Sequence, residues 1–213
     1  MYLPPAFKED RLEVQHALIR KHPLGLLVTV GREGPMASPL PFLLDRAASK
    51  LGTLRSHLAR ANRQWQDSRP DMNALIIFQG PDIYVTPSWY ATKQETGKVV
   101  PTWNYATVQI HGRLKVIDDR DWLLAQITAM TEQMEGQRQN PWAVSDAPSD
   151  YVQSQINGIV GLEIEITAIE GKWKVSQNRP GADRRGVVAG LAETPAGENA
   201  KAMMELVKDR GGL

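Results

Sequence analysis

The sequence predicts a mainly β protein of the α+β class, an antiparallel barrel with helices packed around its outside. Three observations support this class. Short strand-like segments recur along the chain, few helical segments lie between them, and Leu162–Ile166 (LEIEI) alternates strictly between apolar and charged residues. A strand that alternates in this way buries one face and exposes the other, as antiparallel sheets commonly do. A doubly wound parallel sheet would need a helix between successive strands, so the pattern argues against it.

Further strands are predicted where apolar, β-branched or aromatic residues run between turn signals. They cover Leu24–Val30, Met36–Asp45, Leu51–Arg55, Ala74–Gln79, Ile83–Thr86, Val99–Ile117 and Trp173–Ser176. Gly80-Pro81-Asp82 predicts a hairpin turn between the fourth and fifth of these strands, and Glu170-Gly171 predicts a turn before the last. The run Val99–Ile117 is too long for one flat strand, so we expect a bend or bulge within it.

Helices are predicted where apolar residues recur at helical spacing and capping residues stand at the ends. They cover residues 10–22, residues 56–69, Asp119–Met134, Asp150–Asn157, Arg185–Ala192 and Glu198–Lys208. Acidic residues open the first of these helices and basic residues close it, as the helix dipole favours.

Composition excludes several classes of function. The chain has 213 residues, 42% of them hydrophobic, and a formal net charge of +1, which argues against a polyanion as the main partner. The absence of cysteine removes disulfides, thiolate metal sites and cysteine nucleophiles. The four histidines show no metal-binding spacing, and no nucleophile elbow, P-loop or dinucleotide fingerprint occurs. With no signal peptide and no run of membrane-spanning length, we expect a soluble, cytoplasmic protein.

The sharpest local signal lies in Leu51–Trp65 (LGTLRSHLARANRQW). A strand is predicted to bring Arg55 to the start of a helix capped by Ser56, with His57 in its first turn and Arg60 one turn further on. Helix N–H groups, a hydroxyl and guanidinium groups together form a pocket for phosphate or carboxylate. The alternative is a plain helix cap whose arginines lie in water.

Aromatic and cationic residues gather in Pro87–Arg113 around a predicted polar loop. They are Trp89, Tyr90, Lys93, Lys98, Trp103, Asn104, Tyr105 and His111. Such a set can form one wall of a site for a flat anionic ligand, because the rings offer stacking faces and the lysines meet negative charge. The alternative is that the rings pack in the core or an interface and the lysines lie on a solvated loop.

The C-terminal part carries two further segments of interest. Ser176, Gln177, Asn178 and Arg179 follow a predicted strand; amides can pair with the edge of a heteroaromatic ring and an arginine can neutralise an anion on it. The alternative is a solvated loop. Residues 183–213 contain two helical patterns that resemble a helix-turn-helix, but they hold five basic and five acidic residues. DNA contact needs a local basic excess, so a dimer contact or a lid is the better interpretation.

Several short stretches occur in order along the chain: MYLPPAF, HLARAN, WYATK, VPTWNY, HGRL and SQNRPGADRRGVVAGL. Together they resemble the PaiB-type FMN-binding negative transcriptional regulators, a family of the FMN-binding split-barrel group that also holds the pyridoxamine phosphate oxidases. The resemblance runs from residue 1 to about residue 192. It implies a six-stranded antiparallel split barrel with peripheral helices, a homodimer, and FMN in a groove between the subunits.

The resemblance also implies cofactor contacts. They are Arg55, Ser56, His57 and Arg60 at the FMN phosphate; Thr92 and Lys93 near the ring or phosphate; Trp103 and Asn104 beside the ring; and Gln177, Asn178 and Arg179 approaching from the far side, from this subunit or its partner. Residues 1–182 are then the FMN-binding split-barrel domain, and residues 183–213 a helical tail packed on the barrel or the dimer partner. No metal site is expected, and no catalytic residue is identified.

Three functions stay open at this stage. The family resemblance implies negative regulation of transcription, with DNA contacted directly or indirectly. The second is an FMN-dependent oxidoreductase acting on a small molecule with NAD(P)H or oxygen. The third is a dimeric scaffold whose flavin site is vestigial.

Overall fold

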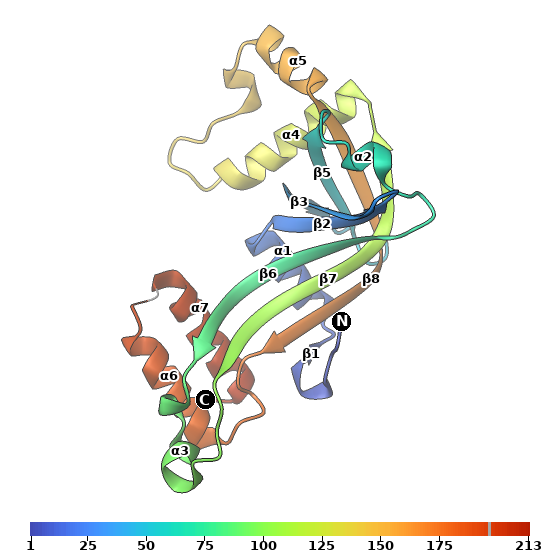
Figure 1. The fold of residues 1–213 in the computed structure, drawn as a ribbon. Coiled ribbons are helices and arrows are strands. Elements are labelled where there is room, and N and C mark those ends of the chain that lie inside the picture. Colours follow the sequence, from blue (N-terminus) through green and yellow to red (C-terminus); the bar gives the residue numbers. More distant parts are fainter. Residues whose placement is uncertain (196) are drawn as a thin grey trace. The chain divides into compact units, whose positions relative to one another are not determined.

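The computed structural model describes residues 1–195 and 197–213, which form one mostly antiparallel sheet together with helices (Figure 1). The strands are β1 (Lys8–Glu9), β2 (Leu24–Gly31), β3 (Gly34–Pro41), β4 (Leu43–Asp45), β5 (Thr53–Ala59), β6 (Ala74–Val85), β7 (Thr102–Ile117) and β8 (Ile159–Lys174). The helices are α1 (Leu12–Lys21), α2 (Gln64–Asp67), α3 (Ala91–Thr96), α4 (Arg120–Glu135), α5 (Ser149–Asn157), α6 (Gly181–Glu193) and α7 (Gly197–Gly211), with short 3-10 turns η1 (Pro5–Phe7), η2 (Pro87–Trp89) and η3 (Val144–Asp146).

The predicted fold class is confirmed. The sheet runs in the order β3-β2-β6-β7-β8-β5-β4, and β1 pairs with β8. The described residues thus give eight strands where six were expected, because the short segments β1 and β4 add to the main set. The two helices predicted in the tail are confirmed as α6 and α7. No helix in the described part of the chain is both long and apolar enough to cross a membrane.

The predicted hairpin at Gly80-Pro81-Asp82 is wrong, because β6 runs through it as one strand. Gly80 serves a close approach instead of a turn. A Cβ atom there would lie 2.9 Å from a methyl carbon of Leu18 and 3.2 Å from the carbonyl oxygen of Ala106. A glycine inside a strand often marks such an approach, and local sequence cannot tell it from a turn glycine.

The predicted turn at Glu170-Gly171 is also wrong, because β8 is one continuous strand. Gly171 pairs with Glu9 of β1, and a Cβ atom on Gly171 would lie 2.8 Å from the carbonyl oxygen of Glu9. The glycine therefore makes room for an edge strand that comes from the far end of the sequence.

The chain divides into two compact units that share the long strands. Unit 1 comprises residues 1–18, 79–108 and 170–213, and unit 2 comprises residues 19–78 and 109–169. The predicted division at residue 182 stays a prediction.

The core of unit 1 joins the ends of the long strands to α6 and α7, which lie side by side (Figure 1). Its buried members are Ile83, Val85, Tyr90, Val175, Val187, Leu191, Ala200, Met203 and Val207. The helix residues recur three or four positions apart, so each helix turns one apolar stripe inward.

Trp89 lies directly on α6, at two glycines. A Cβ atom on Gly186 would lie 1.9 Å from the carbonyl oxygen of Trp89, and one on Gly190 would lie 2.3 Å from its indole ring. Only residues without a side chain fit at these two positions.

We expect Gly186→Ala to lower the free energy of unfolding by about 2 kcal/mol, because the added methyl group overpacks a backbone contact. Urea unfolding followed by circular dichroism measures the change. Gly181→Ala is the matched control on the same helix, since the nearest atom to its Cβ is a mobile guanidinium nitrogen at 3.4 Å. Equal stability of the two variants would contradict the close contact.

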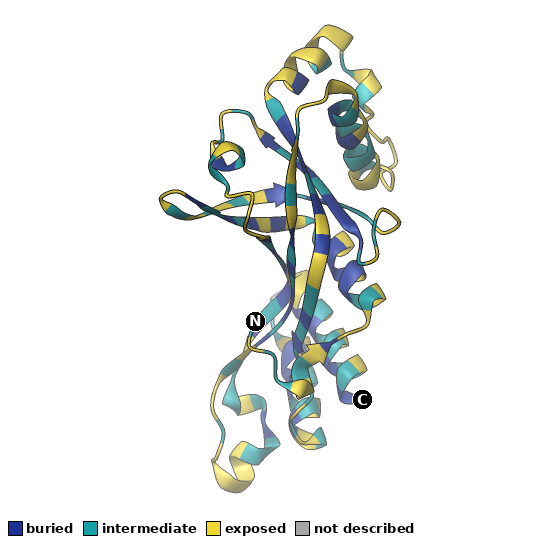
Figure 2. Ribbon diagram, turned by 90° about the vertical axis from the view of Figure 1, so that its right-hand side faces the viewer, coloured by how far each residue is buried: buried dark blue, intermediate teal, exposed yellow. Residues whose placement is uncertain are grey.

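Unit 2 is built on the other halves of the long strands. Its largest fully buried side chains include Leu27, Phe42, Leu54, Ile76, Phe78, Ile110, Leu123, Ile156, Leu162 and Ile164. The rings of Phe42 and Phe78 meet edge to face at 5.6 Å. Buried and exposed residues alternate along the strands (Figure 2). Asp119 caps α4 by accepting a hydrogen bond from the backbone N–H of Trp122 at 2.8 Å, close to where the sequence places that helix.

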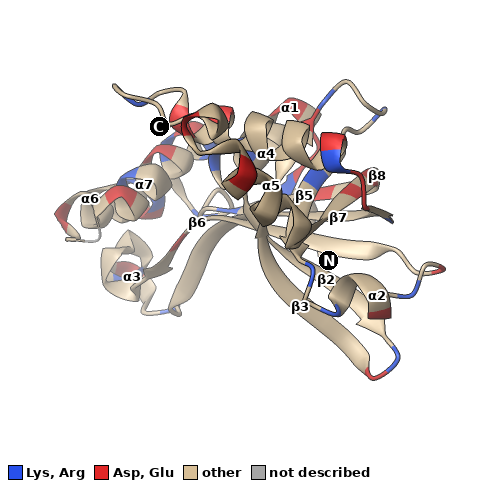
Figure 3. Ribbon diagram, turned by 90° about the horizontal axis from the view of Figure 1, so that it is seen from above, with Lys and Arg blue, Asp and Glu red and all other residues tan. Residues whose placement is uncertain are grey.

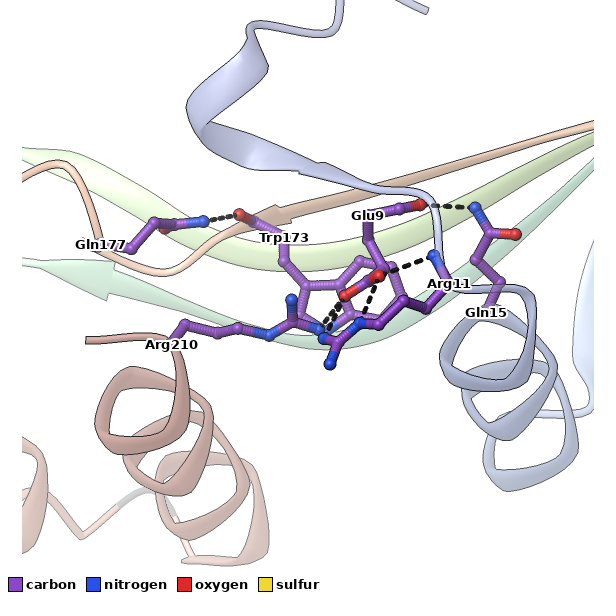
Figure 4. A network of polar contacts seen from close by, with 6 residues as sticks. All are labelled: Glu9, Arg11, Gln15, Trp173, Gln177 and Arg210. Atoms are coloured by element: carbon purple, nitrogen blue, oxygen red, sulfur yellow. Dashed lines mark hydrogen bonds and ion pairs between the residues drawn. The ribbon is translucent and has the colours of Figure 1, made fainter. Parts of the chain in front are cut away.

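A buried carboxylate holds the N-terminal strand of unit 1 to its C-terminal helix (Figure 4). Glu9 is only 2% exposed. It accepts two hydrogen bonds from the Arg11 guanidinium, at 2.9 and 2.7 Å, and one from Arg210 of α7. The Arg210 guanidinium also lies 5.5 Å from the centre of the Trp173 ring.

Candidate functional site

The predicted helix start at Ser56 is wrong. Residues 53–59 form strand β5, which pairs with β8 from Thr53↔Glu165 to Ala59↔Ile159, and the next helix, α2, begins only at Gln64. Pairing along the whole strand outweighs the local capping signal, because backbone hydrogen bonds and burial act together there. The backbone of residues 56–59 therefore offers no helix N-terminus to a phosphate.

Side chains alternate along β5, so the four predicted phosphate contacts do not share one face. Arg55 and His57 lie on the partly exposed face. Ser56 lies on the buried face, where its hydroxyl donates to the carbonyl oxygen of Pro41 at 2.6 Å. Arg60 follows the strand directly. Arg55 and His57 thus remain on one accessible face, while the Ser56 hydroxyl is used inside the fold.

Both arginines of this stretch form ion pairs. Arg55 lies 3.2 Å from Asp45 and 3.2 Å from Glu163. The Arg60 guanidinium bonds both carboxylate oxygens of Asp118. It also donates to the carbonyl oxygens of Asn157, the last residue of α5, at 2.9 Å and of Ile159, the first residue of β8, at 3.0 Å. The hydrogen bond from Arg60 keeps the pKa of Asp118 below its usual value. A phosphate bound by these two arginines would have to replace carboxylates as their partners: Asp45 and Glu163 at Arg55, and Asp118 at Arg60.

His57 connects β5 to the helical layer of unit 2. Its Nδ1 atom lies 2.9 Å from Oε1 of Gln126, a buried residue of α4. The Nε2 atom of the Gln126 amide has no hydrogen-bond partner among the described residues. His57 also lines a cavity of about 270 Å³ whose other walls include Ile127, Trp142 and Tyr151.

In unit 1, the segment predicted as a polar loop holds the short helix α3. Thr92 uses its backbone N–H and its hydroxyl to donate to the buried carboxylate of Asp183, at 2.9 and 3.0 Å. Lys93 is exposed and donates to the hydroxyl of Ser88 at 3.1 Å. Thr92 therefore ties α3 to the first turn of α6, while the Lys93 side chain lies on the surface.

Trp103 and Asn104 are neighbours on β7 and point to opposite faces. Trp103 is 54% exposed, and its ring meets that of Tyr84 edge to face at 6.1 Å. Asn104 is buried, and its amide exchanges two hydrogen bonds with the hydroxyl of Ser176, at 2.9 and 3.2 Å. Ser176 adopts a φ of 66°, a left-handed conformation that costs energy outside glycine. The bonds to Asn104 hold this turn in place.

The turn at Ser176 sets the direction of the three predicted contacts that follow it. Gln177 folds back on its own strand: its Oε1 atom accepts from the backbone N–H of Val175 at 2.8 Å, and its amide nitrogen donates to the carbonyl oxygen of Trp173 (Figure 4). Asn178 is exposed. The Arg179 guanidinium lies 4.7 Å from the centre of the Tyr90 ring.

The sequence alone indicates no role for two lysines that lie beside the predicted contacts. Lys172 and Lys174 lie on the face of β8 opposite Trp173, and both ammonium groups lie near the ring of Tyr105. The alternation K-W-K in a strand was the available signal. The described residues contain no group of three histidine or acidic side chains able to hold a metal ion.

The architecture is that of the split-barrel class. A family model described as "Putative FMN-binding domain" matches residues 1–168, and the chain belongs to that family. The chain is 31% identical over 210 residues to the Protease synthase and sporulation protein PAI 2 of Bacillus subtilis, covering 99% of this chain and 98% of that protein. The resemblance to PaiB-type proteins is thereby confirmed.

Two further comparisons agree. The chain is 35% identical over 248 residues to an uncharacterized protein of Emericella nidulans, covering 100% of this chain and 98% of that one. Its fold is similar to that of the FAD and heme binding protein from Mycobacterium smegmatis, with a TM-score of 0.58 and 15% identity over 78% of this chain and 73% of that one. At that identity the likeness concerns the fold alone.

Proposed function

We propose that this protein is an FMN-binding flavoprotein. The observation that carries the proposal is the family match over residues 1–168, which includes β5, α3 and all of β7. When bound, FMN supplies electron and hydride transfer, while the protein supplies orientation and electrostatics.

Within unit 2, the proposed phosphate contacts are Arg55, His57 and Arg60. Guanidinium groups bind phosphate with two parallel hydrogen bonds, as they bind carboxylates. Asp118 is 61% exposed, so its ion pair with Arg60 is a surface pair of small net stability. A phosphate can take the place of this carboxylate at little cost. Ser56 contributes only its backbone here, because its hydroxyl bonds inward.

The predicted flavin contacts in unit 1 remain proposals. Lys93, Trp103, Asn178 and Arg179 reach the surface or its edge, and Thr92, Asn104 and Gln177 use their polar side chains to hold the local fold. Equilibrium dialysis against FMN tests the cofactor directly: we expect one FMN per chain at saturation. If the protein binds no FMN in this experiment, the proposal is contradicted.

We also propose that two copies associate. Light scattering on the eluting protein is expected to give twice the 23.7 kDa mass of one chain. A mass of one chain at micromolar concentration would contradict the dimer.

The biological role that we propose is negative control of gene expression, which is the role implied by the resemblance to the PaiB-type regulators. The similar protein of Bacillus subtilis is described as Protease synthase and sporulation protein PAI 2. Indirect control is favoured over direct DNA binding, because acidic and basic residues both occur along the described helices α6 and α7 and leave no basic surface there for phosphate (Figure 3). A mobility-shift assay in a salt series tests direct contact, since a DNA-binding protein loses affinity steeply as salt rises.

The second candidate is an FMN-dependent oxidoreductase, favoured by the exposed aromatic and cationic side chains of unit 1, which suit a second flat ligand. Anaerobic stopped-flow mixing with NADPH or NADH distinguishes the two roles. Rapid bleaching of the flavin absorbance supports the oxidoreductase; a flavin that stays oxidised supports the regulatory role.

A further inference from the structure

One exposed face of unit 1 combines aromatic rings with cationic groups. We call it the Lys172–Lys174 face; its members are Tyr2, Tyr84, Trp103, Tyr105, Lys172 and Lys174. Side chains two residues apart on a strand share a face, and the opposite face of the same strands packs into the core of unit 1.

Distances in the structure show that these side chains lie together. The ammonium nitrogen of Lys172 lies 5.5 Å from the centre of the Tyr105 ring and 5.6 Å from that of Tyr2. The ammonium nitrogen of Lys174 lies 6.0 Å from the same Tyr105 ring and donates to the carbonyl oxygen of Trp103 at 2.6 Å. Tyr105 is thus flanked by two cations, at a distance typical of cation–π contacts.

The two lysines of this face have no ion-pair partner in the part of the chain that the structure describes. Glu170, two residues before Lys172 on the same strand, pairs instead with the N-terminal ammonium of Met1 at 2.6 Å. Among the described residues, no acidic oxygen lies within 4.0 Å of a side-chain nitrogen of Lys172, Lys174 or Arg179. Burial lowers the pKa of Lys174, and the charges of Lys172 and Arg179 lower it further. Arg55 and Arg60 in unit 2 differ in this respect, because each has carboxylate partners.

The two lysines of this face lie beyond the part of the chain that the family model matches, whereas its four aromatic residues lie within it. The family match ends at residue 168, before both lysines. Lys172 lies in the part of β8 that pairs with β1, at Lys8↔Lys172 and Glu9↔Gly171.

We propose that the Lys172–Lys174 face binds a nucleotide, with its phosphate on the two ammonium groups and its flat ring against the exposed aromatic side chains. An anion pairs with the two lysines, and the rings of Trp103 and Tyr105 offer stacking surfaces. Because the proposed contacts of the FMN phosphate are Arg55, His57 and Arg60 in unit 2, the nucleotide proposed for this face is a nicotinamide dinucleotide that acts as electron donor. The inference therefore rests on the proposed oxidoreductase function.

Isothermal titration calorimetry on the full chain tests the site with FMN, NADPH and pyrophosphate as separate probes, and with riboflavin as the probe that lacks phosphate. The test variant is Lys172→Gln with Lys174→Gln. The control is Lys201→Gln with Lys208→Gln on α7, which removes the same charge from the same unit. Lys172→Arg with Lys174→Arg keeps the charge, and thermal melts verify that each variant folds.

We expect at least a tenfold loss of affinity for NADPH in the test variant, because charge-assisted contacts to its phosphates are lost. The control and the arginine variant are expected to stay within about twofold. Loss for NADPH with unchanged FMN and riboflavin identifies the electron donor as the ligand, whereas loss for FMN alone overturns the inference. Loss for pyrophosphate in a protein that binds no FMN supports the site while contradicting the proposed function. Unchanged affinities, or no binding of any of the three phosphate probes by the unaltered protein, overturn the inference.

Discussion

Replacing Glu9 by glutamine is expected to lower the free energy of unfolding by about 2 kcal/mol at neutral pH. Glu9 is buried and accepts charged hydrogen bonds from Arg11 and Arg210, which join β1 to α7. Glutamine keeps the size of the side chain but removes its charge, so Arg210 loses its ion-pair partner. The loss stays moderate because the Arg11 side chain is 59% exposed and water can solvate it.

The same substitution is expected to change how stability depends on pH. Burial alone would raise the pKa of Glu9, but hydrogen bonds from Arg11 and Arg210 outweigh it and lower the pKa from 4.5 to about 2. A lowered carboxyl pKa stabilises the fold above the unfolded value, and that stabilisation is lost as pH falls through the folded value. The difference between the two proteins should therefore be constant above about pH 5 and should shrink between pH 4.5 and pH 2.

Chemical unfolding at a series of pH values measures both effects. Glu193→Gln is the matched control, because this side chain lies exposed on α6 and forms no ion pair among the described contacts. A stability difference for Glu9→Gln that is below about 0.5 kcal/mol at neutral pH, or that does not change in acid, would contradict the role of the network.

Replacing Arg55 and Arg60 together by alanine is expected to reduce FMN affinity about 100-fold, since two charge-assisted contacts to phosphate are removed. Affinity for riboflavin should change little, because riboflavin carries no phosphate. Fluorescence titration measures both ligands. Arg55 also links β4 to β8 through Asp45 and Glu163, so Arg55→Lys with Arg60→Lys serves as the variant that keeps the charge.

Asp118→Asn provides the opposite test. It removes the carboxylate that bonds Arg60 and leaves the guanidinium available to a phosphate. We expect FMN affinity to rise a few-fold, on the order of the small stability of a surface ion pair. If the alanine pair binds FMN as tightly as the unaltered protein, the phosphate lies elsewhere.

Much of the fold follows from local sequence patterns. Apolar residues recur at helical spacing in α1, α4, α6 and α7, and apolar and polar residues alternate in part of β8. The structure contains all of these elements. The patterns did not predict that β6 and β8 each continue as one strand through a predicted turn. Gly80 and Gly171 look like turn residues, but each is a small residue beneath a neighbouring element that sequence alone does not reveal. Strand length is set by these distant partners.

The candidate site shows even more clearly that local sequence does not reveal distant partners. Ser56 has the residue type and spacing of a helix cap, yet β8 pairs with the whole of β5 and makes it a strand. The exposure of Trp103 and the burial of Asn104 follow from strand alternation once the register is known. Lys172 and Lys174 received no role because two lysines in a polar segment resemble ordinary solvated charges. Their importance depends on Tyr105, which is far away in sequence.

Parallel fluorescence titrations with FMN and riboflavin on the purified chain test most directly whether this protein binds a flavin nucleotide through its phosphate. We expect saturable binding of one FMN per chain, with an affinity at least tenfold higher than that for riboflavin, because cationic side chains contact the phosphate. Equal affinities for the two flavins would contradict the phosphate contacts, and the absence of saturable binding by either would contradict the flavoprotein assignment itself.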